Sequence, residues 1–546
     1  MPTEARPHRV QRAGTRLARS RLVSAPAVLG GAKVTATLPL PTPPPVTTDA
    51  ISGSDDVKLA ARNGMQLGGS LLFTWIIGLS LTTVVLPHLV SPSEVGVLGF
   101  GEAVASIVLV AATFGLDVFI RKEVARKSDT ARQFIMGTLV ARAAASAMLV
   151  LSAVVVLQRL GRDHTAIEVV VWFGLATFMA QSADINAALL QAVGHVGGQA
   201  RISMLTKVLW AAIAVGGLQL GFGLRSVPIA MAISEGIKGV VLGWQAHRVL
   251  RIPFSLRHQR VLPVLRTSLP FLATALAVRV MMWLDVTVMG IMLTDARGKE
   301  ATGLYFSALR LGQLALILAP VATWVLMPLA SRSFHRSAYE FQRLVQRSFQ
   351  TGLTIAIPLT ALLAMNADVV ISILQPPAYF PASRALRVLA CMFVFTYLNI
   401  LASTFLQIRG EGWWVVRATI ATIVVDLFML LILVPIGHRS WGVGGAGLAA
   451  AIALISAEAI ASVLLTSRLG RHSFDAQSLR TIAATAYAVA CVVVIDRVAA
   501  HHGLFVWRTV LDVAALSGLL GILHVYDIPA SWGQSLQLRL RTLIRK

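Results

Sequence analysis

Residues 268–329 read SLPFLATALAVRVMMWLDVTVMGIMLTDARGKEATGLYFSALRLGQLALILAPVATWVLMPL and decide the fold class. They form two long apolar segments joined by a polar turn, 294–300, and the apolar segments carry Arg279, Asp285 and Arg310. About 20 mainly apolar residues are enough to cross a bilayer as a helix. A charge at mid-membrane costs roughly 2.5 to 3.5 kcal/mol on insertion scales, so these three residues are functional candidates.

The rest of the chain has the same character. Of its 546 residues, 56% are hydrophobic and 13% are charged, and the mean hydropathy is +0.73, unlike that of a soluble domain of this size. We therefore expect an all-α polytopic membrane protein with about fourteen transmembrane helices. The expected spans are 66–87, 98–119, 135–157, 169–190, 203–222, 227–247, 268–292, 303–328, 350–373, 385–407, 414–436, 443–466, 481–500 and 505–526.

The basic residues are distributed by side of the membrane. Of the 48 lysines and arginines, 33 fall on the side of the N-terminal tail and 10 on the opposite side. The positive-inside rule then predicts that both termini are cytoplasmic. The net charge of +23 comes from basic residues distributed by side of the membrane, not clustered on one solvent-facing domain. We therefore expect no nucleic-acid partner.

Three pairs of segments recur in the same order in the two halves of the chain. Residues 94–96 resemble 300–303, residues 190–194 resemble 406–410, and residues 221–223 resemble 442–444. Six helices per copy bring the second copy into the membrane in the same orientation as the first. The sequence therefore predicts a parallel internal repeat of two six-helix lobes plus two C-terminal helices, with a substrate site between the lobes.

The expected domain organisation follows from the repeat. It comprises a disordered, basic, Pro-rich tail at 1–62, an N-lobe at 63–250, a linker at 251–267, a C-lobe at 268–466, two further helices at 467–526 and a basic tail at 527–546.

Several loose motifs together resemble a known family. They are Leu-Gln-x-x-Gly at 190–194 and 406–410, Phe114-Gly115-Leu116 followed by Arg121-Lys122-Glu123, Gly303-Leu304-Tyr305, and the glycine-rich run 442–447. With about fourteen helices, they resemble the polysaccharide biosynthesis flippases, exporters of undecaprenyl-diphosphate-linked O-antigen or exopolysaccharide units in the multidrug/oligosaccharidyl-lipid/polysaccharide superfamily.

The resemblance implies a two-lobed transporter of the bacterial inner membrane with a central cationic cavity. Its substrate would be a lipid-linked oligosaccharide of the O-antigen, lipopolysaccharide or exopolysaccharide type. Membrane lipids, a polysaccharide polymerase and a chain-length regulator are the further partners that it implies. Lipid II flippases of this superfamily carry arginines in the first helix, whereas residues 66–87 hold no charge, which argues against lipid II as the substrate.

Four basic residues are candidates for contact with an anionic substrate: Arg279, Arg142, Lys238 and Arg310. A guanidinium fork suits the oxygens of a diphosphate. Three of these residues also have a structural alternative. Arg279 could form an ion pair between the lobes, Arg310 could pair with Asp285 at equal depth in the hairpin, and Lys238 could pair with Glu235 one turn away.

Four acidic residues are candidates for binding a coupling ion or forming a gate: Asp285, Asp184, Asp426 and Glu235. They could bind H⁺ or Na⁺, or serve as counterions to the arginines. Because no Walker-type nucleotide-binding loop is present, an ion gradient is the expected energy source. Lys207 lies near the expected inner end of its helix, where it could snorkel, and ranks lower.

Two other functional classes stay open. A drug exporter of the same fold coupled to H⁺ or Na⁺ would line its cavity with acids and aromatics, and a scaffold protein would tolerate loss of the cavity charges. The predicted external loops are no longer than about a dozen residues, too short for the acceptor site of a lipid-linked glycosyltransferase. We expect no catalytic residues, no cofactor and no metal site.

Overall fold

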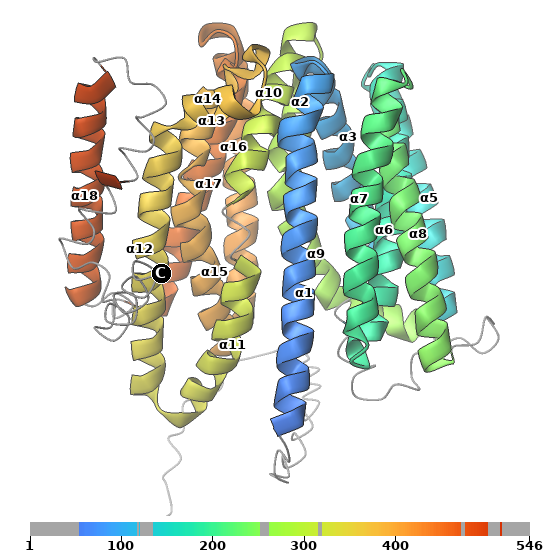
Figure 1. The fold of residues 1–546 in the computed structure, drawn as a ribbon, viewed down its shortest axis with the longest axis horizontal. Coiled ribbons are helices and arrows are strands. Elements are labelled where there is room, and N and C mark those ends of the chain that lie inside the picture. Colours follow the sequence, from blue (N-terminus) through green and yellow to red (C-terminus); the bar gives the residue numbers. More distant parts are fainter. Residues whose placement is uncertain are drawn as a thin grey trace, which may run out of the picture. The chain divides into compact units, whose positions relative to one another are not determined.

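A computed structural model describes residues 54–116, 119–120, 135–251, 261–314, 319–470, 476–500 and 514–515. Within these ranges every regular element is a helix (Figure 1). Residues 57–546 form one compact unit and residues 1–56 another, of which only the first turn of α1 is described. The predicted tail 1–62 therefore falls almost wholly outside the described residues.

The helices of the first half, each with its bounds, are α1 (Ser54–Ser80), the π-helical turn η1 (Leu81–Val85), α2 (Leu86–Leu89), α3 (Pro92–Val110), the 3-10 turn η2 (Ala111–Thr113), α5 (Ile135–Arg159), α6 (His164–Ala192), α7 (Val196–Gln219) and α8 (Ser226–Leu250). Those of the second half are α9 (Val261–Met292), α10 (Ala296–Gly312), α11 (Ala319–Arg336), α12 (Ala338–Met365), α13 (Ala367–Leu374), the 3-10 turn η5 (Pro377–Tyr379), α14 (Ala382–Leu389), α15 (Met392–Ile408), α16 (Gly412–Ser440), α17 (Gly445–Leu469) and α18 (Ala476–Ala500).

Eleven helical segments in the described part of the chain are long and apolar enough to cross a membrane. They correspond to eleven of the fourteen predicted spans, and the chain is a multi-pass membrane protein.

The three other predicted spans are not described as single long helices. The predicted span 303–328 is divided between α10 and α11, with residues 315–318 outside the described ranges. Span 481–500 falls in α18, which lies beside α12 and contains a shorter apolar helix, Ile482–Val493 (Figure 1). Span 505–526 is described only at 514–515, so the count of fourteen is not confirmed.

Helix α3 begins and ends with clear local signals. Ser91 and Glu94 form a capping box, in which each side chain accepts a hydrogen bond from the other residue's backbone, and Pro92 occupies the first turn. At the other end, Phe114 and Gly115 have positive φ and end the helical path. A Cβ on Gly115 would lie 2.5 Å from the Leu272 amide nitrogen, so this glycine lets α3 end directly against the backbone of α9.

The predicted repeat is visible in the backbone. Gly194 and Gly410 both have positive φ after α6 and α15. An equivalent hydrogen bond closes each helix: His195 N donates to Leu190 O, and Glu411 N donates to Leu406 O, both at 2.9 Å. Before α8 and α17, Gly221 and Gly223 match Gly442 and Gly444, all four with positive φ. The segments that resemble each other in sequence thus adopt the same conformation.

The third matching pair lies at the contact between the two halves. A Cβ on Gly96 of α3 would lie 2.1 Å from the Lys299 carbonyl oxygen, and a Cβ on Gly303 of α10 would lie 1.8 Å from the Pro92 carbonyl oxygen. The contact is reciprocal, as a pseudo-two-fold axis requires, because each glycine meets the residue four positions before the other. We call this contact of α3 with α10 the seam.

The glycine-rich run 442–447 serves close helix packing. A Cβ on Gly445 would lie 2.4 Å from the carbonyl oxygen of Gly437, so α16 and α17 meet backbone to backbone at their turn.

Candidate functional site

A cavity of about 910 Å³ lies among α1, α3, α6, α7, α8, α9 and α10. Helices from both halves of the chain therefore line it. Its charged lining residues are Glu102, Asp184, Lys207, Glu235, Lys238, Arg279 and Arg310. Five of these, Arg279, Lys238, Arg310, Asp184 and Glu235, are among the eight predicted site residues.

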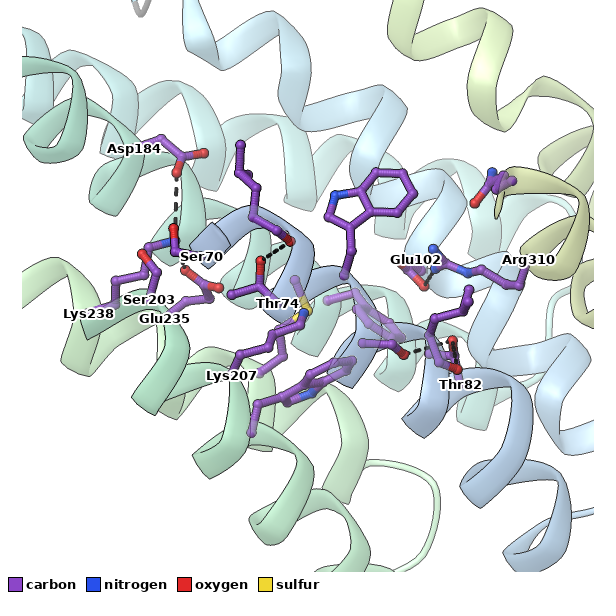
Figure 2. A pocket seen from close by; sticks show the side chains of 18 of the residues that line it. Ser70, Thr74, Thr82, Glu102, Asp184, Ser203, Lys207, Glu235, Lys238 and Arg310 are labelled. Carbon is purple, nitrogen blue, oxygen red and sulfur yellow. Dashed lines mark hydrogen bonds and ion pairs between the residues drawn. The ribbon is translucent and has the colours of Figure 1, made fainter. Parts of the chain in front are cut away.

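Lys238 of α8 lies at one end of the cavity (Figure 2). Its ammonium is 2.9 Å from Glu235 Oε2 and 3.7 Å from Asp184 Oδ1. The predicted pairing of Lys238 with Glu235 is thus confirmed, because residues three apart share a helix face. This group carries two carboxylates for one ammonium, so it is not a site of excess positive charge.

Arg310 of α10 lies in a second charged group, apart from the first in Figure 2. Its Nη2 donates a hydrogen bond to Oε2 of Glu102 on α3. The guanidinium carbon is also 5.1 and 4.8 Å from the ring centroids of Trp283 and Phe306. Arg310 therefore joins the two halves of the chain at the wall of the cavity.

The predicted pair of Asp285 with Arg310 is wrong. Tyr305 donates its hydroxyl hydrogen bond to Asp285 instead, while Arg310 binds Glu102. The Arg310 guanidinium does lie near Trp283, two residues before Asp285 on α9. However, five residues along a helix turn the side-chain direction by about 140°, so Tyr305 and Arg310 point to different neighbours.

Lys207 and Arg279 are the two cavity cations without an ion pair to a carboxylate of a described residue. Lys207 of α7 lies between the two charged groups in the view of Figure 2, with its ammonium 3.8 Å from the centroid of the Trp210 ring. Arg279 of α9 is exposed to the cavity. They come from different halves of the chain, so an anionic ligand that reached both would bridge the halves.

Arg142 does not line the cavity, contrary to the prediction. It is fully buried on α5, and its Nη2 donates to Gln181 Oε1 at 3.2 Å. Gln181 in turn donates from Nε2 to the Leu109 carbonyl oxygen at 3.0 Å. This chain ties α5 and α6 to the end of α3, which is a structural role.

Asp285 and Asp426 form a separate carboxyl pair in the second half of the chain. Asp285 of α9 is 3% exposed and Asp426 of α16 is 2% exposed, and their carboxyl groups lie close enough to interact. Burying two neighbouring carboxylates without a cation is costly, so this arrangement favours a shared proton or a bound cation. One oxygen of each, Oδ1, has no hydrogen-bond partner. Glu458 of α17 faces the pair and accepts a hydrogen bond from Asn399.

Three polar links accompany the seam. Lys299 of α10 forms an ion pair with Asp163, and the Tyr379 hydroxyl donates to the Val90 carbonyl oxygen at 3.0 Å. Burial, with a smaller effect of the Glu94 carboxylate, raises the pKa of Tyr379, so its hydroxyl remains a donor at neutral pH. Gln375 donates to the Thr83 carbonyl oxygen in η1 at 2.9 Å. All three links join the two halves of the chain.

Sequence reasoning missed Glu102 and Glu458 as site residues and underrated Lys207. Lys207 and Trp210 are three residues apart, a spacing that places both on one helix face and could have identified Lys207. Glu102 could have been noted as an acid within an apolar span. Among the described residues, no group of three or more His, Cys, Asp or Glu side chains could hold a metal ion.

The sequence matches the family described as polysaccharide biosynthesis protein over residues 85–383, more than half of the chain. The chain belongs to this family. A relative, the probable low-salt glycan biosynthesis flippase of Haloferax volcanii, is 22% identical over 364 residues, which cover 66% of this chain and 74% of that protein.

Two solved transporter structures share the fold of this member of the polysaccharide biosynthesis family. Lipid II flippase MurJ in an inward closed conformation matches with a TM-score of 0.66 and 14% identity, over 83% of this chain and 96% of that one. An inward-facing multidrug resistance transporter of the MATE family matches with a TM-score of 0.59 and 16% identity, over 74% of this chain and 95% of that one.

Proposed function

We propose that the protein is a flippase that moves an undecaprenyl-diphosphate-linked oligosaccharide across the bacterial cytoplasmic membrane for surface polysaccharide synthesis. The observation that carries the proposal is the pair of cavity cations Lys207 and Arg279, which have no carboxylate partner among the described residues. Family membership and the flippase named among the relatives support the same assignment.

The diphosphate lies between Lys207 and Arg279 in this proposal. A guanidinium donates two parallel hydrogen bonds to phosphate oxygens, and an ammonium acts as a point charge beside it. Because the two cations belong to different halves, substrate binding draws the halves together around the headgroup. The polyprenyl tail stays in the lipid, and the sugars occupy the remainder of the cavity.

The positive-inside rule orients the cavity relative to the membrane. With both termini cytoplasmic, the seam lies toward the external face, since α3 and α10 begin there. The described conformation is then closed toward the outside. Alternating access requires the seam to open while the opposite ends of the two halves approach each other.

The Asp285–Asp426 pair is the proposed site of the coupling ion. Both carboxyls are buried, and each has an oxygen without a hydrogen-bond partner. A proton or a Na⁺ ion between the two oxygens offsets the cost of burying two like charges. Asp184 and Glu235 bind Lys238 and are assigned as its counterions.

A drug exporter coupled to H⁺ or Na⁺ is the second candidate. The carboxylates Glu102, Asp184 and Glu235 line the cavity together with Trp75, Phe173 and Trp210, a lining that suits an organic cation. The ion pairs of these carboxylates with Arg310 and Lys238 favour the flippase.

Deletion of the gene in its host distinguishes the two functions. We expect lipid-linked repeat units to accumulate on the cytoplasmic face and surface polysaccharide to be lost, with drug sensitivity unchanged. Increased drug sensitivity with normal surface polysaccharide would establish the exporter instead.

A further inference from the structure

Helix α10 lies between the Asp285–Asp426 pair and the seam. Gly303 faces α3, where a Cβ would lie 1.8 Å from the Pro92 carbonyl oxygen, so no side chain fits. Tyr305, two residues later, points to the other side and donates its hydroxyl hydrogen bond to Asp285 Oδ2. Two residues rotate a helical side chain by about 200°, so one short helix contacts both features on nearly opposite faces.

Tyr305 has no room to adjust on its own. Its side chain is 0% exposed, and α17 packs directly on it, because a Cβ on Gly447 would lie 3.2 Å from the Tyr305 Cβ and 3.5 Å from its Cα. The backbone and Cβ of Tyr305 are therefore held against α17, while its hydroxyl is held by Asp285. A shift of the Asp285 carboxyl has to move α10 as a rigid body, since close-packed interiors transmit strain.

We propose that Tyr305 is the positioning residue that links occupancy of the Asp285–Asp426 pair to opening of the seam. This inference rests on the proposed function, which assigns the coupling ion to that pair. With a proton between the carboxyls, Asp285 Oδ2 accepts from Tyr305 and α10 stays against α3. When the ion between the carboxyls, a proton or Na⁺, binds or leaves, Asp285 reorients. Tyr305 then transmits this movement along α10 to Gly303 at the seam.

The side chains next to the Asp285–Asp426 pair determine which residues can respond to a bound ion. Among the described residues, the Tyr305 hydroxyl and Glu458 of α17 are the titratable groups that interact with the two carboxyls. Among the described residues, no lysine, arginine or histidine forms an ion pair with either carboxyl. The test therefore compares the effect of replacing a carboxyl of the pair with the effect of replacing Tyr305, which among the described residues is the tyrosine that binds Asp285.

The test measures closure of the seam in liposomes with the full-length chain. Asp163 and Lys299, which form an ion pair across the two halves, are replaced by cysteine in a Cys391→Ser, Cys491→Ser background, and a short bifunctional thiol reagent reports their proximity. The yield is followed on acidification and on addition of Na⁺. We expect one of these ions to change the yield by about fivefold or more, as is usual between coupled sites.

Tyr305→Phe should abolish this ion response while the protein inserts normally. Tyr379→Phe is the matched control: Tyr379 is also buried, and its hydroxyl also donates a hydrogen bond, but to Val90 at the seam rather than to the carboxyl pair. The control should change the basal yield and keep the response.

A full ion response in Tyr305→Phe, together with its loss in Asp285→Asn, would overturn the role of Tyr305 and leave the coupling site standing. A parent protein that responds to neither ion would overturn both the coupling site and this inference.

Discussion

Arg279 and Lys207 carry the proposal at the scale of single residues. Replacing either with glutamine removes a charge-assisted contact of about 2 kcal/mol, so transport should fall roughly tenfold or more for each variant. Arg347→Gln is the control, because Arg347 is exposed on α12 and does not line the cavity. The measurement is transport per molecule of inserted protein. Full transport activity of both cavity variants would contradict the proposed diphosphate site.

The Arg310–Glu102 pair has a structural role that a double-mutant cycle can measure. Arg310→Gln leaves a partly buried carboxylate without its cation, so stability should fall by about 2 kcal/mol, and Glu102→Gln should cost a similar amount. The double variant should lose less than the sum of the two. Thermal unfolding in detergent gives the comparison, and strictly additive losses would show that the two side chains do not interact.

At the scale of elements, the seam depends on the absence of two side chains. Gly96→Ala places a methyl group 2.1 Å from the Lys299 carbonyl oxygen, which is backbone and cannot yield without separating α3 from α10. The cross-linking yield between cysteines at 163 and 299 should therefore fall by about tenfold.

Gly216→Ala is the matched control for the seam. Gly216 is a helical glycine of α7 with nothing within 4 Å of its Cβ position, so alanine there should leave the yield unchanged and should stabilise the helix slightly. Equal yields in the two alanine variants would argue against a close backbone contact at the seam.

The helices and turns also show which features of the fold the sequence could predict and which it could not. Hydropathy located eleven of the spans, and the matched glycines located the repeat, because both depend on local composition and backbone conformation. Depth along a helix predicted that Asp285 and Arg310 are at one level. It could not predict which way each side chain points, because an error of one or two residues in a helix boundary rotates every side chain by about 100° to 200°.

Arg142 is a second residue whose side-chain environment the sequence could not predict. A charge at mid-membrane is equally consistent with a cavity and with a buried hydrogen-bonded position, and only the fold distinguishes them. The glutamine that binds Arg142, Gln181, is 39 residues away in the chain, on α6. No spacing rule within one helix connects the two.

At the scale of the whole molecule, the central claim is that an anionic, lipid-linked oligosaccharide crosses the membrane through the cavity. The direct measurement reconstitutes the purified chain in liposomes with that substrate in one leaflet and detects its sugars in the other leaflet with an impermeant reagent. The account predicts translocation by the unmodified protein, strong loss in Arg279→Gln and Lys207→Gln, and no transport of organic cations. Transport of organic cations without movement of the lipid-linked oligosaccharide would contradict it.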